Sequence, residues 1–181
     1  MLPLALALAI IVILFLVVVA GQPDEFAVSR QTRISAPPDR IFPLVNEVRR
    51  WEGWNPWAKA DPNCVMTYGG PASGVGASYA WKGNSKVGEG RSTIVESKPT
   101  EQVRFRLEFL KPFAGTNAAD FTFQKQGMDT VVTWTMTGTS HPTTKIFGLL
   151  MNCDKMIGGQ FEKGLTQMKS IAESTPPIPL T

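Results

Sequence analysis

The sequence predicts an α+β fold: a curved antiparallel sheet of about seven strands wrapped around a long C-terminal helix, with two short helices after the first strand. Three observations lead to this prediction: an uncharged apolar run at 2–20, alternating segments between 64 and 140, and a helical stripe between 143 and 172. Consecutive strands followed by one long helix are typical of folds in which a helix layer covers one face of an antiparallel sheet.

The apolar run at 2–20 contains no charge, no hydrogen-bonding side chain and no glycine. A helix of this length spans roughly 28 Å at about 1.5 Å per residue, close to the ~30 Å hydrocarbon thickness of a bilayer. We therefore expect a single-pass transmembrane anchor at 2–20 and a linker at 21–25. The arginines that follow favour a domain on the cytoplasmic side; they are Arg30, Arg33 and Arg40.

A cleaved signal peptide is the alternative interpretation of this run. Val18 and Ala20 suit the positions before a cut at Gly21. However, no lysine or arginine precedes the run, and it is longer than the usual ~7–15-residue apolar region of signal peptides. A retained anchor is therefore the favoured interpretation.

The folded domain is expected at 26–173, beginning with a strand and two short helices. Along FAVSRQTRI, which starts at Phe26, larger side chains alternate with smaller or polar ones, as in a strand. Ser35 and two prolines then signal entry into a helix. Helical spacing follows at Ile41, Leu44, Val45 and Val48. Because Pro43 limits the regularity of this segment, we expect two short helices broken near Asn46.

After Asp61 the sequence is typical of an antiparallel sheet, because Gly, Pro and Asn separate its apolar segments. The segments lie near 64–69, 76–83, 86–97, 101–110, 117–126 and 129–140. In VRFRLEF, which starts at Val103, apolar residues share one face and charged residues the other. We therefore expect one covered face and one solvated face.

A long helix from Thr143 to Ala172 is expected to cover the sheet. Its apolar residues recur three or four positions apart and form one stripe. They are Ile146, Leu150, Cys153, Ile157, Phe161, Leu165, Met168 and Ala172. Its glycines each weaken a helix by up to ~1 kcal/mol, so close approach to the sheet or a bend over a cavity must compensate. The tail at 174–181 contains three prolines and is expected to be disordered.

This order of elements is the helix-grip order, and several stretches of sequence support it. ISAPPDRIFPLVNEVRRWEGWNPWAKADP, which starts at Ile34, and MIGGQFEKGLTQMKSIAES, which starts at Met156, resemble the polyketide cyclase/dehydrase branch of the START-like (SRPBCC) superfamily. GEGRSTIVESKPTEQVRFRLEF and DTVVTWTMTG are similar to the family's middle strands. Gln160 departs from the pattern, since many relatives have an acidic residue there. The resemblance covers 26–173 and implies a helix-grip fold.

The resemblance also implies a cavity between the concave sheet and the long helix. Pockets of this kind bury a ligand through apolar contact and orient it with a few polar groups. The candidate lining residues are Trp54, Trp57, Trp81, Phe105, Phe109, Phe121, Phe123, Trp134, Met136, Met151, Met156 and Phe161. The same side chains can instead fill a core. The cluster of Trp51, Trp54 and Trp57 is interpreted as a plug at the open end of the sheet, with a gate or a membrane contact as the alternative.

Composition and motifs argue against several other classes of protein. The net charge is +3, and the basic residues are scattered, so no nucleic-acid partner is expected. Cys64 and Cys153 lie far apart without a Cys or His companion, so we expect no metal site, while a disulfide between them stays open. No cofactor motif is present. The catalytic candidates form no recognised constellation; they are Glu89, His141, Asp154 and Glu162.

We therefore expect a membrane-anchored domain that binds a hydrophobic or lipid-like small molecule. Its partners would be the bilayer, through the N-terminal helix, and the apolar ligand. One alternative is a polyketide cyclase/dehydratase-type enzyme, and another is a protein-interaction module with a filled core. An apolar cavity would favour the carrier. A cavity with paired polar groups would favour the enzyme, and a filled interior would favour the interaction module.

Overall fold

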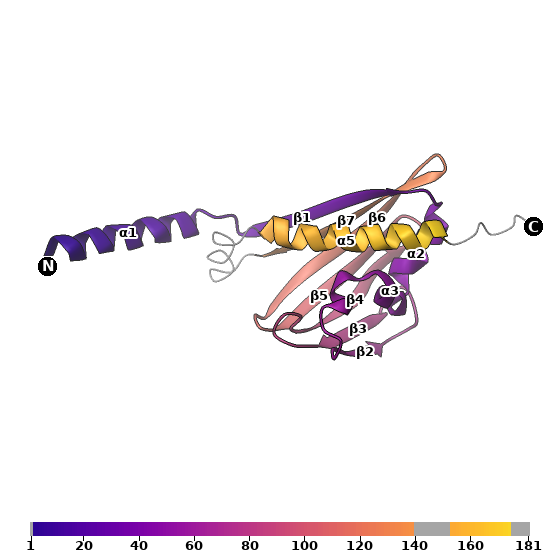
Figure 1. Ribbon diagram of the computed structural model, residues 1–181, viewed down its shortest axis with the longest axis horizontal. Helices are drawn as coiled ribbons and strands as arrows, with labels where there is room; N and C mark the ends of the chain where they lie inside the picture. The colour runs from indigo at the N-terminus through magenta and orange to yellow at the C-terminus, as the bar shows by residue number, and fades with distance from the viewer. Residues whose placement is uncertain (1, 140–152, 175–181) are drawn as a thin grey trace, which may run out of the picture.

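The computed structural model of the 181-residue chain describes residues 2–139 and 153–174. Helix α1 (Leu2–Ala20) precedes a domain made of one sheet, short helices and one long helix (Figure 1). The strands are β1 (Glu25–Ile34), β2 (Val65–Gly69), β3 (Ser78–Lys82), β4 (Glu89–Lys98), β5 (Gln102–Lys111), β6 (Gly115–Gln126) and β7 (Asp129–Thr139). The domain's helices are α2 (Pro38–Asn46), α3 (Trp51–Trp54), the 3-10 helices η1 (Val48–Arg50) and η2 (Pro56–Lys59), and α5 (Cys153–Ser174).

The seven strands form one antiparallel sheet in the order β1-β7-β6-β5-β4-β3-β2. The register pairs Phe105 with Ala119 and Phe121 with Trp134, so these side chains share one face. Helix α5 covers this face, which we call the inner face (Figure 1). The predicted strands and the α+β helix-grip architecture are thus confirmed, because alternation along each strand marks the buried face directly.

The helical segments also follow the prediction where they are described. The first short helix ends at Asn46 and the second begins at Trp51. Asn55 then accepts a hydrogen bond at its side-chain oxygen from the backbone N–H of Trp57 (3.1 Å) and starts η2. The long C-terminal helix is confirmed at Cys153–Ser174. Its predicted beginning at 143–152 and the disordered tail predicted after Ser174 lie outside the described residues.

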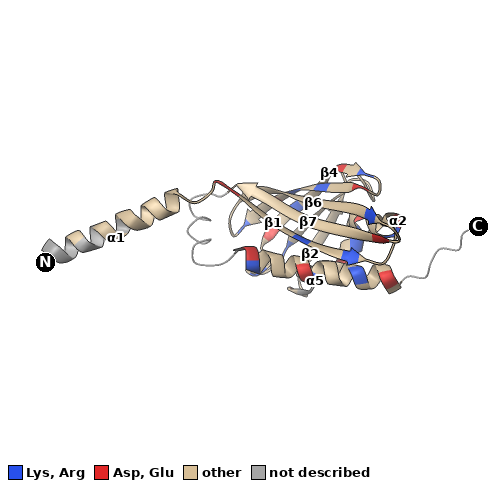
Figure 2. Cartoon of the chain, turned by 90° about the horizontal axis from the view of Figure 1, so that it is seen from above, with Lys and Arg blue, Asp and Glu red and all other residues tan. Residues whose placement is uncertain are grey.

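Helix α1 extends away from the domain and carries no charged side chain among its described residues (Figure 2). Most of its described side chains are exposed, among them Leu6, Ile11 and Leu14. Over the described part of the chain, no helix meets the length and hydropathy expected of a membrane span. The helix itself is confirmed, whereas the transmembrane role and the cytoplasmic orientation stay predictions.

An aromatic cluster fills the centre of the domain between the sheet and the helices. Trp134 stacks on Phe161 of α5 with ring centroids 4.0 Å apart and an interplanar angle of 10°. Its ring also lies 4.8 Å from that of Phe121. Trp51 contacts Trp54 at 4.6 Å and Phe121 at 5.7 Å. Aromatic pairs of this kind contribute about 0.5–1.5 kcal/mol beyond the burial of their surface.

Two of the central tryptophans are held by hydrogen bonds to the preceding helix. The Trp51 indole N–H donates to the Val45 carbonyl (2.9 Å), and the Trp54 indole N–H donates to the Leu44 carbonyl (2.8 Å). Both side chains are buried. Trp51 and Trp54 are thus buried in the domain centre, and Trp57 is half-buried at its margin. Their role as a plug at the end of the sheet stays a prediction.

An ion-pair cluster fixes the first turns of α5 to strand β1. Arg30 lies at an inner-face position of β1 and donates from both terminal nitrogens to the Asp154 carboxylate (2.9 and 3.1 Å). Its Nε donates to Glu162 (2.8 Å). A Cβ atom at Gly158 would overlap the Arg30 guanidinium, whereas one at Gly159 would meet nothing within 4 Å. Gly158 is thus the glycine that lets β1 and α5 approach closely.

The pair of adjacent glycines gives a matched test of this contact. We expect Gly159→Ala to raise the free energy of unfolding by about 1 kcal/mol through helix propensity. The same change at Gly158 should lower it, because the new methyl group displaces the guanidinium of Arg30. In an Arg30→Ala background, Gly158→Ala should regain the stabilising effect seen at position 159. Urea denaturation of all variants measures these changes, and equal effects of the two substitutions would contradict the close approach.

A second prediction separates the two kinds of buried tryptophan. Trp54→Phe removes a hydrogen bond to a buried carbonyl, whereas the Trp134 N–H has no hydrogen-bond partner within the described structure. Both substitutions remove the same atoms from a packed interior. We therefore expect Trp54→Phe to lower the free energy of unfolding by about 1 kcal/mol more than Trp134→Phe. Denaturant unfolding followed by circular dichroism measures the difference, and the reverse order would show that the hydrogen bond to Leu44 is not stabilising.

Candidate functional site

The predicted cavity-lining residues divide into a buried group and a half-open group. The buried residues are Trp54, Phe105, Phe121, Phe123, Trp134, Met136 and Phe161. Trp57, Trp81 and Phe109 are half-buried. Met156 is 51% exposed on α5, and Met151 lies outside the described residues. The structure therefore brings most of the predicted set to the inner face, where its central members contact one another. Their role as ligand contacts stays a prediction.

Over the residues that the structure describes, the inner face is less covered at one end of the sheet, where β1 begins and β7 ends. The register places Phe26, Gly138, Asn117 and Leu107 side by side across four neighbouring strands. Phe109 lies at the next inner-face position of β5. All five residues are half-buried, in contrast with the fully buried Phe105. We call these five residues the open end. Of these five residues, only Phe109 is among the cavity-lining residues predicted from the sequence.

Two polar groups of interest lie on the inner face: Asn117 within this apolar surface, and the N–H of Trp134 two inner-face positions further along β7 from Gly138. A Cβ atom at Gly138 would overlap the side-chain oxygen of Asn117 and would approach the Phe26 ring at 2.8 Å, so the amide lies over the glycine backbone. The buried Trp134 N–H is the second group. The Cζ3 atom of Trp134 faces Gly164 on α5, and the indole nitrogen lies on the opposite edge of the ring. The N–H is therefore directed away from this part of α5.

The titratable groups of the site region are already engaged in structural contacts. Hydrogen bonds from Lys111 and then Lys82 hold the pKa of the Glu89 carboxyl below its ordinary value. The hydrogen bond from Arg30 does the same for Asp154. Burial raises the pKa of the Tyr79 hydroxyl, so this group stays protonated near neutral pH. These carboxylates stay ionised and paired, an arrangement unsuited to general acid catalysis.

Metal binding and thiol chemistry find little support in the described residues. Within that part of the chain, no group of three or more His, Cys, Asp or Glu side chains is placed to hold a metal ion. Cys64 is a free, half-buried cysteine, so the disulfide that the sequence left open is not formed in this structure. Burial raises the pKa of its thiol, which disfavours the reactive thiolate. His141 lies outside the described residues.

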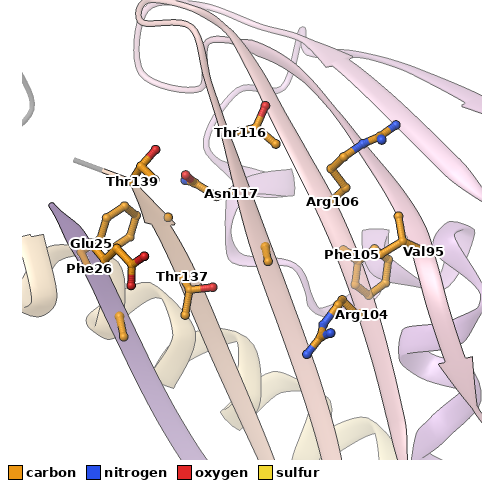
Figure 3. Close-up of a pocket in the computed structure, with 13 residues that line it drawn as sticks. Glu25, Phe26, Val95, Arg104, Phe105, Arg106, Thr116, Asn117, Thr137 and Thr139 are labelled. Carbon is orange, nitrogen blue, oxygen red and sulfur yellow. The ribbon is translucent and has the colours of Figure 1, made fainter. Parts of the chain in front are cut away.

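A hollow of about 550 Å³ lies on the outer face of the sheet, on the side away from α5 (Figure 3). The small side chains of Ala27 and Ala118 contribute to it, and Glu25, Arg104 and Arg106 are among its polar lining. Arg104 is paired with Asp120 (2.7 Å). Its lining also includes Val95 and the open-end residues Phe26, Asn117 and Gly138. The hollow is open to solvent, whereas a small-molecule site usually encloses most of its ligand. Sequence analysis did not predict this hollow.

Arg30 is the residue of greatest structural importance that sequence analysis missed. It was interpreted as part of the alternation of β1, without a partner. The signal was present, because alternation with Phe26 and Val28 places Arg30 on the covered face, where a charge requires an opposite charge. Asp154 and Glu162 were named only as catalytic candidates that form no recognised constellation. They are exposed, but both bind Arg30.

Comparisons with known proteins agree with this architecture. A family model described as "Polyketide cyclase / dehydrase and lipid transport" matches residues 25–173. Comparison with curated proteins gave no match. Among solved structures, protein CV1439 from Chromobacterium violaceum is similar with a TM-score of 0.60 at 14% identity, covering 85% of this chain and 100% of that one.

Two further solved structures carry more informative descriptions. The di-domain ARO/CYC BexL from the BE-7585A biosynthetic pathway gives a TM-score of 0.61 at 14% identity, covering 89% of this chain and 54% of that one. The Aha1 dimer from Colwellia psychrerythraea gives 0.57 at 18% identity, covering 82% and 97%. At such identities these likenesses show the fold alone. Because the family model spans nearly the whole domain, the chain belongs to the polyketide cyclase/dehydrase and lipid transport family of the SRPBCC superfamily.

Proposed function

We propose that the domain binds an apolar, lipid-like small molecule at the open end of the inner face. The observation that supports this proposal most directly is the half-buried apolar surface of Phe26, Leu107 and Phe109, which continues from a fully packed centre. Transfer of such surface from water to a ligand is favourable by roughly 25 cal/mol per Å². The family description, which includes lipid transport, agrees with a ligand of this class.

Two polar groups, one at the open end and one deeper on the inner face, suit a ligand that carries a hydrogen-bond acceptor. Trp134 has a buried indole N–H without a partner among the described residues. A buried donor left unpaired costs about 1–3 kcal/mol, so a carbonyl or ester oxygen that reached it would gain specific binding. The Asn117 amide can both donate and accept. An apolar surface with a few oriented polar groups is the usual composition of a small-molecule site.

We further propose that α1 anchors the domain in a membrane. The supporting observations are its uninterrupted apolar sequence and its exposed side chains, including Ile11 and Leu14. Exposed apolar surface of this extent is costly in water and favourable in lipid. The anchor would hold the open end near the bilayer into which apolar ligands partition.

An interaction module with a filled core is the second candidate function. The dense contacts of Trp51, Trp134 and Phe161 favour it, because they occupy much of the space in which family members of the carrier type would hold a ligand. An enzyme has less support, since the described carboxylates are paired in structural contacts. The first experiment below distinguishes the carrier from the interaction module, and the second tests the anchor.

The ligand prediction compares one charge placed on opposite faces of the sheet. We expect the full-length protein, extracted with its native lipids, to carry an apolar small molecule detectable by native mass spectrometry. Leu107→Glu should reduce the occupied fraction about tenfold, because a carboxylate in an apolar contact costs well over 1.4 kcal/mol of binding. Val95→Glu, on the outer face, is the control and should leave occupancy unchanged. Loss of the ligand only in Val95→Glu would place it in the outer hollow instead. An empty wild-type protein would favour the interaction module.

The anchor prediction uses membrane fractionation. We expect the full-length protein to stay with membranes after a carbonate wash. Lysine substitutions at Ile11 and Leu14 should release it, because each charge costs about 2.5–3.5 kcal/mol at the centre of a membrane-spanning helix. A shortened wild-type chain that begins at Gly21 and is recovered in the soluble fraction would instead show a cleaved signal peptide.

A further inference from the structure

The attachment of α1 defines one end of the domain, which we call the anchor-side end. Four residues separate Ala20 from Glu25, so this joint spans at most about 18 Å even when extended. Antiparallel pairing puts the beginning of β1, the end of β5 and the beginning of β6 at the same end of the sheet. The tip of the β5–β6 hairpin, residues 110–114, therefore projects toward the side from which α1 leaves (Figure 1).

The hairpin tip presents large apolar side chains at its surface. Leu110 is 62% exposed and Phe113 is 53% exposed. The tip is continuous along β5 with Phe109 and Leu107, which belong to the open end. Two exposed large apolar residues on one turn differ from the scattered single residues that are usual on protein surfaces. Met128, 86% exposed in the β6–β7 turn, is such a single residue at the opposite end of the sheet.

Positive charge surrounds this apolar tip. Lys111 lies within it, Lys82 is the last residue of β3, and Lys86 lies in the β3–β4 connection. All three side chains are exposed. Glu89 pairs with both Lys111 (2.7 Å) and Lys82 (3.3 Å), so one carboxylate is shared by two ammonium groups. The group of three lysines and one glutamate therefore retains net positive charge. The acids nearest α1, Asp24 and Glu25, lie apart from it at the start of β1, four strands away from β4 in the sheet.

We infer that the β5–β6 hairpin tip docks into the interfacial layer of an anionic bilayer. Leu110 and Phe113 would enter the boundary between headgroups and acyl chains, while Lys82, Lys86 and Lys111 would face anionic headgroups, the pattern of interfacial membrane contacts. The inference rests on the proposed anchor, which brings this end of the sheet to the membrane. The inference deepens the proposed function, because docking would turn the open end toward the lipid. An apolar ligand could then pass between the bilayer and the open end without crossing water.

The test uses the full-length chain in nanodiscs of phosphatidylcholine with phosphatidylserine. In a Cys64→Ser, Cys153→Ser background, an environment-sensitive fluorophore is attached at Leu110→Cys and, as the matched control, at Met128→Cys. Lipids with a nitroxide near the top of the acyl chain then quench whichever probe reaches the interface. We expect several-fold stronger quenching at position 110 than at 128. A Phe113→Ser variant should weaken it, and so should replacement of the three lysines by glutamine.

The outcomes separate this inference from the proposed function. Equal quenching at positions 110 and 128, in protein that has entered the nanodiscs, would overturn docking. The ligand proposal would be unaffected, since native mass spectrometry of the same sample reads ligand occupancy independently. Protein that fails to enter the nanodiscs would overturn both the anchor and the docking. Quenching at 110 that is equally strong in purely zwitterionic discs would overturn the role assigned to the lysines.

Discussion

The stacking of Trp134 against Phe161 is the contact on which the rest of the domain depends. It is the closest described ring pair between the sheet and α5, at 4.0 Å and nearly parallel. In the sheet, β7 lies between β1 and β6. Fixing α5 over Trp134 of β7 therefore also sets the distance of the helix from Arg30 on β1 and from Phe121 on β6. The small Gly158 then allows the helix to approach Arg30 of β1 closely, and Gly164 allows it to approach Trp134 of β7.

Tight packing at the centre leaves the two ends of the inner face unequal. Toward α2 the face is closed by buried residues such as Phe42 and Phe123. Toward the start of β1 the corresponding positions are half-buried, and Gly138 contributes no side chain to cover them. A ligand site in this domain would therefore be expected at the second end, rather than at the packed centre of the space between sheet and helix, where the family resemblance implies a cavity.

Local patterns in the sequence predicted the elements well but could not predict contacts between distant segments. Alternation of Val103, Phe105 and Leu107 depends only on neighbours in the chain, so the strand and its inner face were correct. The pairing of Arg30 with Asp154 joins residues 124 positions apart and requires the register of β1 and the position of α5. The outer hollow likewise depends on side chains of Ala27 and Ala118 from non-adjacent strands. Asn117 is half-buried because the register places it between Leu107 and Gly138. The residue types alone do not predict this register.

Placing the open end and the α1 attachment on the same side of the domain has a physical consequence for the proposed function. In the proposed arrangement, a ligand that partitions into the bilayer would be concentrated there, and a tether of four residues would make the encounter between ligand and open end effectively intramolecular. Modest affinity then suffices, and it has an advantage, because a carrier must also release its ligand. The packed aromatic centre fits this requirement, since the rings of Trp51 and Trp134 occupy the middle of the inner face and the proposed site is the half-buried surface beyond Phe105. A shallow site of this kind would exchange its ligand with the membrane more readily than a deep one.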